Sequence, residues 1–424
     1  MLLSFSIGTF KTVDGFSITS TAICYNGNFY GFTLIVHLCP MDRTKIQYIF
    51  KMKIGILTLP FNNNYGGYLQ AYALMTVLKN LGHDVELIYR KHNKRPLSLR
   101  VKYFLKTFIK CCIGRKHGRL LLDQDKELRE KGVNIMPFVD TYISPKTKQL
   151  FSTKTLGKLC NNRYDAIIVG SDQVWRPDYV PNIQNFFLNF IHNDKIIKIS
   201  YAASFGERKP KYTEQERMEC GQLIQLFDHV SLREDSGLCV IKDFGWKTKC
   251  SPQIVLDPTM LLDKAHYERL FTQNGSNGDY VCTYLLDDNS ITNDLTETIV
   301  KTLNIPKVSI LDEKNWKKST YKMPSIEYWL QRIHDAKFVV TDSFHGTVFC
   351  ILFNVPFIVY NNQGRGSDRF LTLLGHFGLE DRLVSDISNI NNLICSDIMW
   401  EEINLKIHSL KEESLVYINL ALKR

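Results

Sequence analysis

The chain has 424 residues, of which 44% are hydrophobic and 23% are charged. This is the composition of a soluble globular protein, and the length suits two domains better than one. The 53 Lys and Arg residues exceed the 43 Asp and Glu residues by ten. This excess favours anionic partners such as phosphates, acidic sugars, lipid headgroups or nucleic acid, but falls short of a histone-like chain. Eleven cysteines without a C-x-x-C pair indicate reduced thiols in a cytoplasmic protein, and no apolar run reaches the roughly 18 residues of a membrane span.

The first 51 residues differ from the rest of the chain. They alternate apolar residues with glycine and hydroxyl-bearing residues without a sustained period, and they lack the pattern of a signal peptide. The apolar run from Phe32 to Cys39 is too short to span a membrane. We expect residues 1–51 to be a non-native extension, with the working protein beginning near Met52. The alternative is an extra hairpin packed on the surface.

From residue 52 onward, short strands rich in Val and Ile alternate with helical patterns. This alternation predicts an α/β fold of parallel sheets with helices on both faces. A polar break near 263–278 divides it, so we expect one domain at 52–262, a second at 263–395, and a last helix within 396–424 that returns to the first domain. The expected strands are 53–59, 84–89, 164–169, 196–202, 228–232, 253–256, 279–286, 307–311, 337–341 and 356–360.

The first candidate ligand-binding turn follows the first of these strands. Ligands of open parallel sheets bind beyond the carboxyl ends of the strands. Here the sequence reads N-N-N-Y-G-G, with Asn64, Gly66 and Gly67 placed where a helix begins. Glycine permits a close approach to the backbone, and a helix N-terminus favours an anion. The alternative is a tight turn capped by asparagine.

The loops after the third and fourth strands predict contacts with a sugar. The third strand is followed by G-S-D-Q-V-W, which crowds a carboxylate, an amide and an indole onto one loop. Polar edges suit hydroxyl groups and an aromatic face suits a sugar ring; the alternative is a capped turn with a packed tryptophan. After the fourth strand, small residues leave room near the backbone. The candidate residues of the two loops are Ser171, Asp172, Gln173, Trp175 and Ser204.

A cationic residue, Arg233, ends the fifth strand. An arginine there can grip a carboxylate or phosphate with two hydrogen bonds. The alternative is an ion pair with Glu234 or Asp235 in the same loop.

The second domain offers a histidine and two further arginines. The sequence T-D-S-F-H-G-T places His345 in the first turn of a helix, where it is a candidate proton donor or anion ligand. The glycine-rich loop after the next strand leads to Arg365 and Arg369, which also suit an anion. A structural histidine and a solvated loop are the alternatives.

Six motifs keep their order along the chain: M-K-I-G-I-L-T with N-Y-G-G-Y-L-Q-A-Y-A-L, D-A-I-I-V-G-S-D-Q-V-W, S-Y-A-A-S-F-G, V-S-L-R-E-D-S-G, V-L-D-P-T-M-L-L and V-V-T-D-S-F-H-G-T-V-F. Together they resemble the polysaccharide pyruvyl transferase family over about residues 52–385. The resemblance implies two Rossmann-like domains facing across a cleft, as in B-type glycosyltransferases. It also implies transfer of the enolpyruvyl unit of phosphoenolpyruvate to a hexose of a surface-polysaccharide precursor, commonly as a pyruvate ketal.

The resemblance also implies roles for individual residues. Arg233 resembles the family arginine that binds phosphoenolpyruvate, and His345 resembles the family histidine at the donor. Many members carry S-R-L-H, whereas this chain has Ser343 in place of that arginine. A second anion-binding arginine must then come from elsewhere, and Arg365 and Arg369 are the candidates.

The residue types suit this chemistry. Phosphoenolpyruvate is polyanionic, so its pocket needs cations and helix N-termini. A protonated His345 could deliver a proton to the methylene carbon and stabilise the departing phosphate, while Asp172 orients or deprotonates a sugar hydroxyl. Because the sequence has no metal-ligand cluster, we expect no metal and no cofactor, with phosphoenolpyruvate as the donor substrate.

Residues 90–119 suggest a membrane partner. This segment is rich in Lys and Arg, lacks Asp and Glu, and places apolar residues such as Val101 and Leu105 on one helical face. Such a helix can lie on an anionic membrane, which would suit a lipid-linked acceptor at its inner face; the alternative is a core-facing helix with a solvated basic face. No nucleic-acid-binding motif accompanies the charge.

Two other functions remain open. One is a glycosyltransferase that uses a nucleotide sugar, because fold does not fix chemistry. The other is a non-catalytic protein that binds anionic glycans. The sequence identifies neither the acceptor sugar nor the hydroxyls that are joined.

Overall fold

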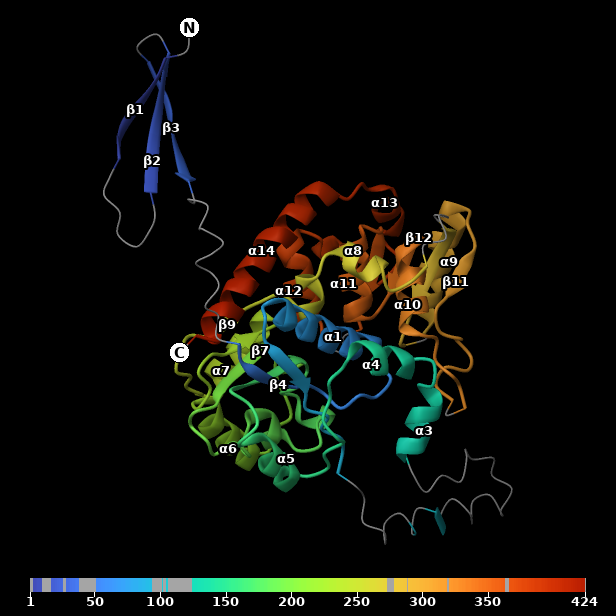
Figure 1. Ribbon diagram of the computed structural model, residues 1–424. Coiled ribbons are helices and arrows are strands. Elements are labelled where there is room, and N and C mark those ends of the chain that lie inside the picture. The colour runs from blue at the N-terminus through green and yellow to red at the C-terminus, as the bar shows by residue number, and fades with distance from the viewer. Residues whose placement is uncertain are drawn as a thin grey trace. The chain divides into compact units, whose positions relative to one another are not determined.

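All the strands expected after residue 51 form in the computed structural model, and they build two separate parallel sheets (Figure 1). The N-terminal sheet has the strand order β5-β4-β6-β7-β8-β9. Its strands are β4 (Lys53–Leu57), β5 (Asp84–Leu87), β6 (Ala166–Asp172), β7 (Ile197–Ala203), β8 (Ser231–Leu232) and β9 (Gln253–Ile254). The structure describes Leu3–Thr9, Ser17–Tyr25, Asn28–His37, 51–93, 101, 104–105, 124–272, 278–287, 289–318, 320–362 and 366–423.

Helices cover both faces of the N-terminal sheet. Alternate strand residues point to opposite sides, so each strand contributes apolar side chains to both faces. Ile56 and Ile168 pack with Leu69 of the helix α1 (Tyr65–Asn80), while Ile167 and Val169 belong to a separate hydrophobic cluster. The helices of that second face are α5 (Thr153–Cys160), α6 (Glu214–Ile224) and α7 (Asp235–Asp243). The nearly continuous apolar strands noted in the sequence therefore mark strands buried on both faces.

The C-terminal sheet has the order β11-β10-β12-β13-β14, and its neighbouring strands pair in parallel. Its strands are β10 (Gly278–Tyr284), β11 (Lys307–Ser309), β12 (Ala336–Thr341), β13 (Phe357–Tyr360) and β14 (Leu383–Val384). The sequence did not predict β14, which has only two residues. One face is covered by α10 (Ile326–His334) and α11 (Phe344–Phe353), and the other by α9 (Ser290–Leu303) and α13 (Ile390–Cys395). Further α-helices among the described residues include α3 (Gln124–Lys131), α4 (Met136–Tyr142), α8 (Lys264–Glu268), α12 (Asp368–Phe377) and α14 (Trp400–Ala421).

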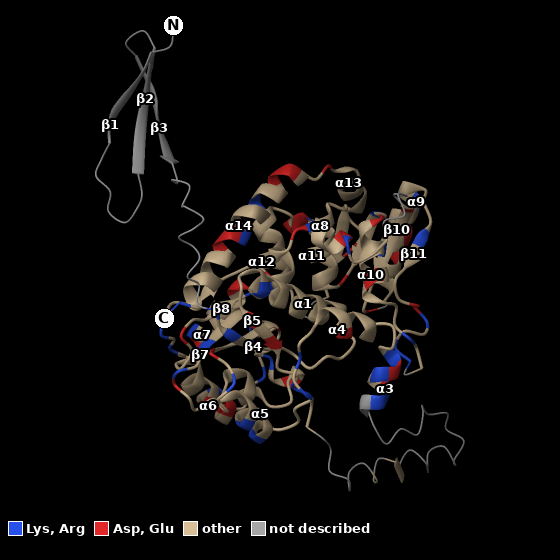
Figure 2. Cartoon of the chain, viewed as in Figure 1, with Lys and Arg blue, Asp and Glu red and all other residues tan. Residues whose placement is uncertain are grey.

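The two sheets share one hydrophobic core. The short 3-10 helix η3 (Pro258–Leu261) connects the two domains and packs against α1, α11 and α14. The last helix, α14, lies on the N-terminal domain, where the Tyr417 hydroxyl donates a 2.9 Å hydrogen bond to the Ser200 carbonyl. Figure 2 shows charged residues along α14 but almost none on α1 and α11, as expected for two helices held inside this core.

The first 51 residues form a unit of their own, Met1–Lys51, separate from the unit Met52–Arg424. Its described strands, β1 (Leu3–Thr9), β2 (Ser17–Tyr25) and β3 (Asn28–His37), pair in antiparallel fashion as a three-stranded sheet. This is one strand more than the hairpin that the sequence left open, and the non-native origin of the segment stays a prediction. Within the described part of the chain, no helix combines the length and the apolar character needed to cross a membrane.

The larger unit is thus an α/β structure of two Rossmann-like domains, each built on its own parallel sheet. Asp172 at the end of β6, Tyr284 at the end of β10 and Asp342 just after β12 lie around one cavity, as expected for ligand sites at the carboxyl ends of parallel strands.

Candidate active site

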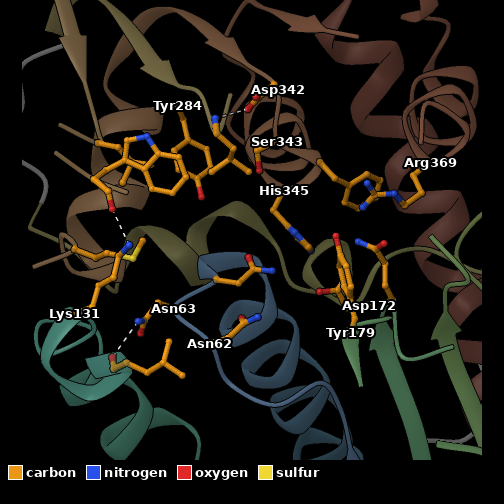
Figure 3. A pocket seen from close by; sticks show the side chains of 18 residues that line it. Asn62, Asn63, Lys131, Asp172, Tyr179, Tyr284, Asp342, Ser343, His345 and Arg369 are labelled. Carbon is orange, nitrogen blue, oxygen red and sulfur yellow. Dashed lines mark hydrogen bonds between the residues drawn. The ribbon is translucent and has the colours of Figure 1, made fainter. Parts of the chain in front are cut away.

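A cavity of about 330 Å³ lies between the two domains (Figure 3). The predicted site residues that line it are Asn64, Asp172, Gln173, Ser343, His345 and Arg369. The lining residues are Asn62, Asn63, Asn64, Leu128, Lys131, Asp172, Gln173 and Tyr179 from the N-terminal domain, and Tyr284, Leu286, Leu311, Trp316, Met323, Asp342, Ser343, Phe344, His345 and Arg369 from the C-terminal domain. The predicted cleft site is therefore present, and its walls come from both sheets.

The turn before α1 contacts the predicted catalytic histidine. Asn64 caps α1, and its side-chain oxygen accepts a 3.1 Å hydrogen bond from the Gly66 amide. A Cβ on Gly66 would lie only 2.0 Å from Nδ1 of His345, whereas a Cβ on Gly67 would meet nothing closer than Asn64 at 3.9 Å. Glycine is therefore required at residue 66 because an imidazole ring from the other domain packs against its backbone.

His345 stands in the first turn of α11, as the sequence predicted. Ser343 caps this helix by accepting a 3.3 Å hydrogen bond from the Gly346 amide, and it also lines the cavity. The His345 side chain is buried, and its Nε2 atom lies 3.6 Å from Oδ2 of Asp257. The two helices α1 and α11 thus begin at the same cavity, with the imidazole between them.

Asp257 is the centre of a buried network that reaches both domains. Its Oδ2 atom accepts hydrogen bonds from the Gln70 amide and from Arg233, and its Oδ1 atom accepts one from the Thr259 hydroxyl at 2.7 Å. Burial alone would raise the pKa of this carboxyl. The close approach and charge of His345, with the charge of Arg233 and the bonds from Thr259, instead hold the pKa well below its usual range. Asp257 is therefore a carboxylate that faces the imidazole.

Arg233 lies beneath the cavity and does not line it. Its guanidinium is buried 3.3 Å from Asp172 Oδ1 and 3.2 Å from Asp257 Oδ2, with Glu234 3.6 Å away. It also lies over the ring of Phe344, 4.3 Å from the centroid. This corrects the prediction that Arg233 grips the donor, because carboxylates of the protein already surround its charge. Arg233 and His345 nevertheless both reach Asp257, from different domains.

The loop after β6 divides between the cavity and the core. Asp172 and Gln173 line the cavity, and Asp172 adopts a positive φ of 73° where β6 ends. Ser171 lies behind them, accepting a 2.9 Å hydrogen bond from Gln70 and donating one to the Ala202 carbonyl. Ser171 thus holds the turn in place and does not line the cavity.

Two predicted sugar contacts are wrong in this structure. Trp175 is fully buried, stacks on Phe187 at 4.9 Å and donates its indole N–H to the Phe186 carbonyl at 2.9 Å. Its ring faces are covered by the core and cannot receive a sugar. Ser204 is also fully buried, and its hydroxyl accepts a 3.0 Å hydrogen bond from the Gly206 amide.

Arg369 is the predicted arginine that does line the cavity. It lies in the first turn of α12, with its guanidinium 5.7 Å from the ring centroid of Phe344. Burial, and then the positive charge of Arg233, lower the pKa of Arg369 to about 10. The negative charges of Glu234 and Asp172 act in the opposite direction. The other candidate, Arg365, lies outside the described residues.

The sequence missed three features of the site. Asp257 belongs to the V-L-D-P-T-M-L-L motif, but nothing in the motif shows that its carboxylate meets a histidine. Lys131 and Trp316 line the cavity from segments with no motif of their own.

Among the described residues, no group of three His, Cys, Asp or Glu side chains could hold a metal ion, and the absence of a metal stays a prediction.

Within the basic segment 90–119, the structure describes residues 90–93, 101 and 104–105. Arg90 and Lys91 are buried, and Arg90 donates a 3.2 Å hydrogen bond to Asn185, so neither can lie on a membrane. Val101 and Leu105 are exposed, as the amphipathic prediction requires of a lipid-facing side. Most of the segment lies outside the described residues, and its contact with lipid stays a prediction.

The sequence model of the polysaccharide pyruvyl transferases matches residues 64–364, which is more than half of the chain. The chain belongs to the polysaccharide pyruvyl transferase family. The matched range includes the cap of α1, Arg233, Asp257 and His345, so the family region contains the network described above. Arg369 lies beyond the matched range.

Several solved structures are similar to this family member. An O-GlcNAc transferase from Thermobaculum terrenum is 10% identical, with 88% of this chain and 66% of that chain covered and a TM-score of 0.41. The UDP-GlcNAc 2-epimerase of Methanocaldococcus jannaschii is 10% identical over 73% of this chain and 83% of that one, with a TM-score of 0.42. The UDP-N-acetylglucosamine 2-epimerase of Rickettsia bellii is 11% identical over 87% and 98%, with a TM-score of 0.38. No curated protein is significantly similar in sequence.

Proposed function

We propose that this member of the family transfers the enolpyruvyl unit of phosphoenolpyruvate to a hexose of a surface-polysaccharide precursor and closes it into a pyruvate ketal. The observation that carries the proposal is the meeting of His345, Arg369 and Asp172 in one interdomain cavity. These three side chains supply a proton donor, an anion-binding cation and a carboxylate for a hydroxyl, which are the groups that ketal formation needs.

The donor binds at the side of the cavity where Arg369 lies. Its carboxylate and phosphate are stabilised by the Arg369 guanidinium and by the N-terminus of α11, which begins at Phe344 after the Ser343 cap. Arg369 thereby takes the place of the arginine that many family members carry at the position of Ser343. Arg233 contributes indirectly, by balancing the charges of Asp172, Asp257 and Glu234 beneath the donor.

The first chemical step adds a hydroxyl across the double bond of the donor. Protonated His345 gives its proton to the methylene carbon, which becomes a methyl group, while a sugar hydroxyl oxygen forms a bond to the neighbouring carbon. Asp172 orients that hydroxyl and accepts its proton. Asp257, 3.6 Å from Nε2, stabilises the charged imidazole and holds its ring in place.

The second step closes the ketal. The carbon–oxygen bond to phosphate breaks, and the oxygen of a second hydroxyl on the same hexose takes the place of the phosphate. The two sugar hydroxyls lose one proton each. One of these is matched by the proton that the methyl group gains, and the other leaves with inorganic phosphate. The overall reaction consumes one phosphoenolpyruvate and one diol, and it requires neither an oxidant nor a cofactor.

Mass spectrometry of candidate lipid-linked oligosaccharides incubated with the protein and phosphoenolpyruvate tests the proposal. The product should gain the mass of one pyruvate minus one water, and one phosphate should be released for each ketal. The His345→Gln variant keeps a hydrogen-bond donor but cannot deliver the proton, so product formation should fall about 100-fold or more. Turnover of nucleotide sugars without phosphoenolpyruvate, or binding of glycans without phosphate release, would replace this proposal.

A further inference from the structure

The cavity has two chemically different sides. Figure 3 shows Lys131 on one side of the view and Arg369 and Asp172 on the other, with His345 between them. Apolar and aromatic side chains, among them Tyr284 and Trp316, also line the cavity, and the proposed mechanism leaves both Trp316 and Lys131 without a role. A three-carbon donor held at Arg369 would leave these residues free to contact the second substrate.

The Trp316 side of the cavity is fixed in place from the opposite domain. Trp316 is partly exposed and lies in the turn that follows β11. The ammonium of Lys131 donates a 2.7 Å hydrogen bond to the Trp316 carbonyl, and the Lys131 carbonyl accepts a 2.8 Å bond from the Met323 amide. Asn134 adds a 2.8 Å bond to the Met323 carbonyl. An aromatic side chain with a fixed backbone can bind a ligand at little entropic cost.

The surroundings of this indole are positively charged. The ammonium groups of Lys131 and Lys317 lie 5.6 Å and 5.4 Å from the centroid of the Trp316 ring. Burial lowers the pKa of Lys131, against the opposing charge of Glu127. Within the part of the chain that the structure describes, no carboxylate lies within ion-pair distance of Lys131. A partly desolvated ammonium of this kind is stabilised by an anionic group of a ligand.

We propose that Trp316 and Lys131 form the acceptor subsite, where the indole packs against the C–H face of a pyranose and Lys131 binds a negatively charged substituent of that sugar. The identity of this ligand as the acceptor rests on the proposed function. The exposed amide of Asn62 lies on the same cavity wall and can bond a hydroxyl. Phosphate and carboxylate both satisfy the charge requirement, so the substrate class is a hexose that bears one of these groups.

Tryptophan fluorescence tests this subsite without requiring turnover. The probes are a panel of hexose 1-phosphates based on glucose, galactose, mannose and N-acetylglucosamine, with glucuronate, the methyl hexosides and UDP alongside. At least one hexose 1-phosphate should quench the emission, and the matching neutral hexoside should bind at least tenfold more weakly. Comparison of hexose 1-phosphates with glucuronate distinguishes phosphate from carboxylate as the preferred group.

Four variants locate the signal. Trp316→Phe should abolish the quench, and Trp316→Ala should weaken binding of the same sugar at least tenfold by calorimetry. Lys131→Met should remove the preference for the charged sugar over its neutral hexoside. The matched control is Lys318→Met, since the Lys318 ammonium donates to Asn315 at 2.6 Å and does not line the cavity. Circular dichroism confirms that each variant is folded.

The inference is overturned if no hexose 1-phosphate or glucuronate quenches the emission, if their affinity is unchanged in Trp316→Ala, or if UDP quenches Trp316 more strongly than every sugar.

Its failure can be told apart from failure of the proposed function by two parallel measurements. Phosphate release from phosphoenolpyruvate that is insensitive to Trp316→Ala rejects the subsite but keeps the transferase. Binding of charged sugars at Trp316 without any phosphate release keeps the subsite and rejects the transferase.

Discussion

The contact between Gly66 and His345 gives the sharpest test of the site. A Cβ at residue 66 would stand 2.0 Å from Nδ1, 2.2 Å from Cγ and 2.5 Å from Cε1 of the imidazole. Ordinary van der Waals contact begins at 3.4 Å, so Gly66→Ala requires the ring or α1 to move by about 1.4 Å, the difference between 3.4 and 2.0 Å. The neighbouring change Gly67→Ala is the matched control, because its nearest contact would be 3.9 Å.

The two substitutions should separate stability from catalysis. Overpacking a buried site costs about 1–3 kcal/mol, and alanine recovers about 0.5–1 kcal/mol over glycine within a helix. The net loss of unfolding free energy in Gly66→Ala is therefore about 0–2.5 kcal/mol. A displacement of about 1 Å at a reacting group can lower the rate about 100-fold, so kcat should fall by about that factor. Gly67→Ala should be as stable as the wild type or more so, with an unchanged kcat.

The assay is phosphate release from phosphoenolpyruvate at saturating acceptor, with thermal unfolding of each variant measured alongside. The expected pattern is a selective loss of kcat in Gly66→Ala, with no corresponding loss in Gly67→Ala. Normal kcat in Gly66→Ala would refute the reasoning, since it would mean either that the imidazole moves away freely or that its position is irrelevant to the reaction. Equal losses in both variants would point to a general defect of the helix start.

Four further predictions concern other parts of the molecule. Arg369→Ala should raise the KM for phosphoenolpyruvate about 10- to 100-fold in steady-state kinetics, with partial rescue by Lys, because a charge-assisted contact is lost. Because the pKa of Asp257 is lower in the folded protein than in the unfolded chain, its carboxylate stabilises the fold above about pH 4, and this contribution is lost as the pH falls further. The unfolding free energy of Asp257→Asn, measured by denaturant titration, should therefore fall less steeply at acid pH than that of the wild type. A chain starting at Met52 should keep its Tm and kcat, and reduced soluble yield would contradict this. If the segment 90–119 binds lipid, the protein should sediment with anionic vesicles at low salt and be released at high salt.

The sequence predicted the fold well because its signal is local. Buried parallel strands require runs of branched apolar residues, and these runs marked every strand after residue 51 except β14. The end of β6 was missed: the predicted strand stops at 169, whereas the ladder continues until Asp172 pairs with Ala203. Polar residues such as Ser171 look like loop residues in a sequence, although their backbone is still part of the sheet.

The choice between two tryptophans shows where local reasoning fails. Trp175 follows a strand and an acidic residue, which is the sequence pattern of a ligand-binding loop, but its side chain turns into the core beside Phe187. Trp316 follows a three-residue strand in a lysine-rich turn that suggests only a solvated surface. It lines the cavity because Lys131, 185 positions earlier in the chain, holds its carbonyl. Side-chain direction and distant hydrogen bonds decide both cases.

Arg233 shows the same limit for charge. An arginine at the carboxyl end of a parallel strand looks ready for an anionic ligand, but the same edge of the sheet also receives the residues that follow the neighbouring strands. Here Asp172 ends β6 and Asp257 follows β9, so their carboxylates reach the guanidinium before any substrate can. Arg369, to which the proposed function assigns the donor, comes from the other domain and lines the cavity. Under that proposal, donor binding should depend on how the two domains meet, because the network around Asp257 belongs largely to one domain and Arg369 belongs to the other.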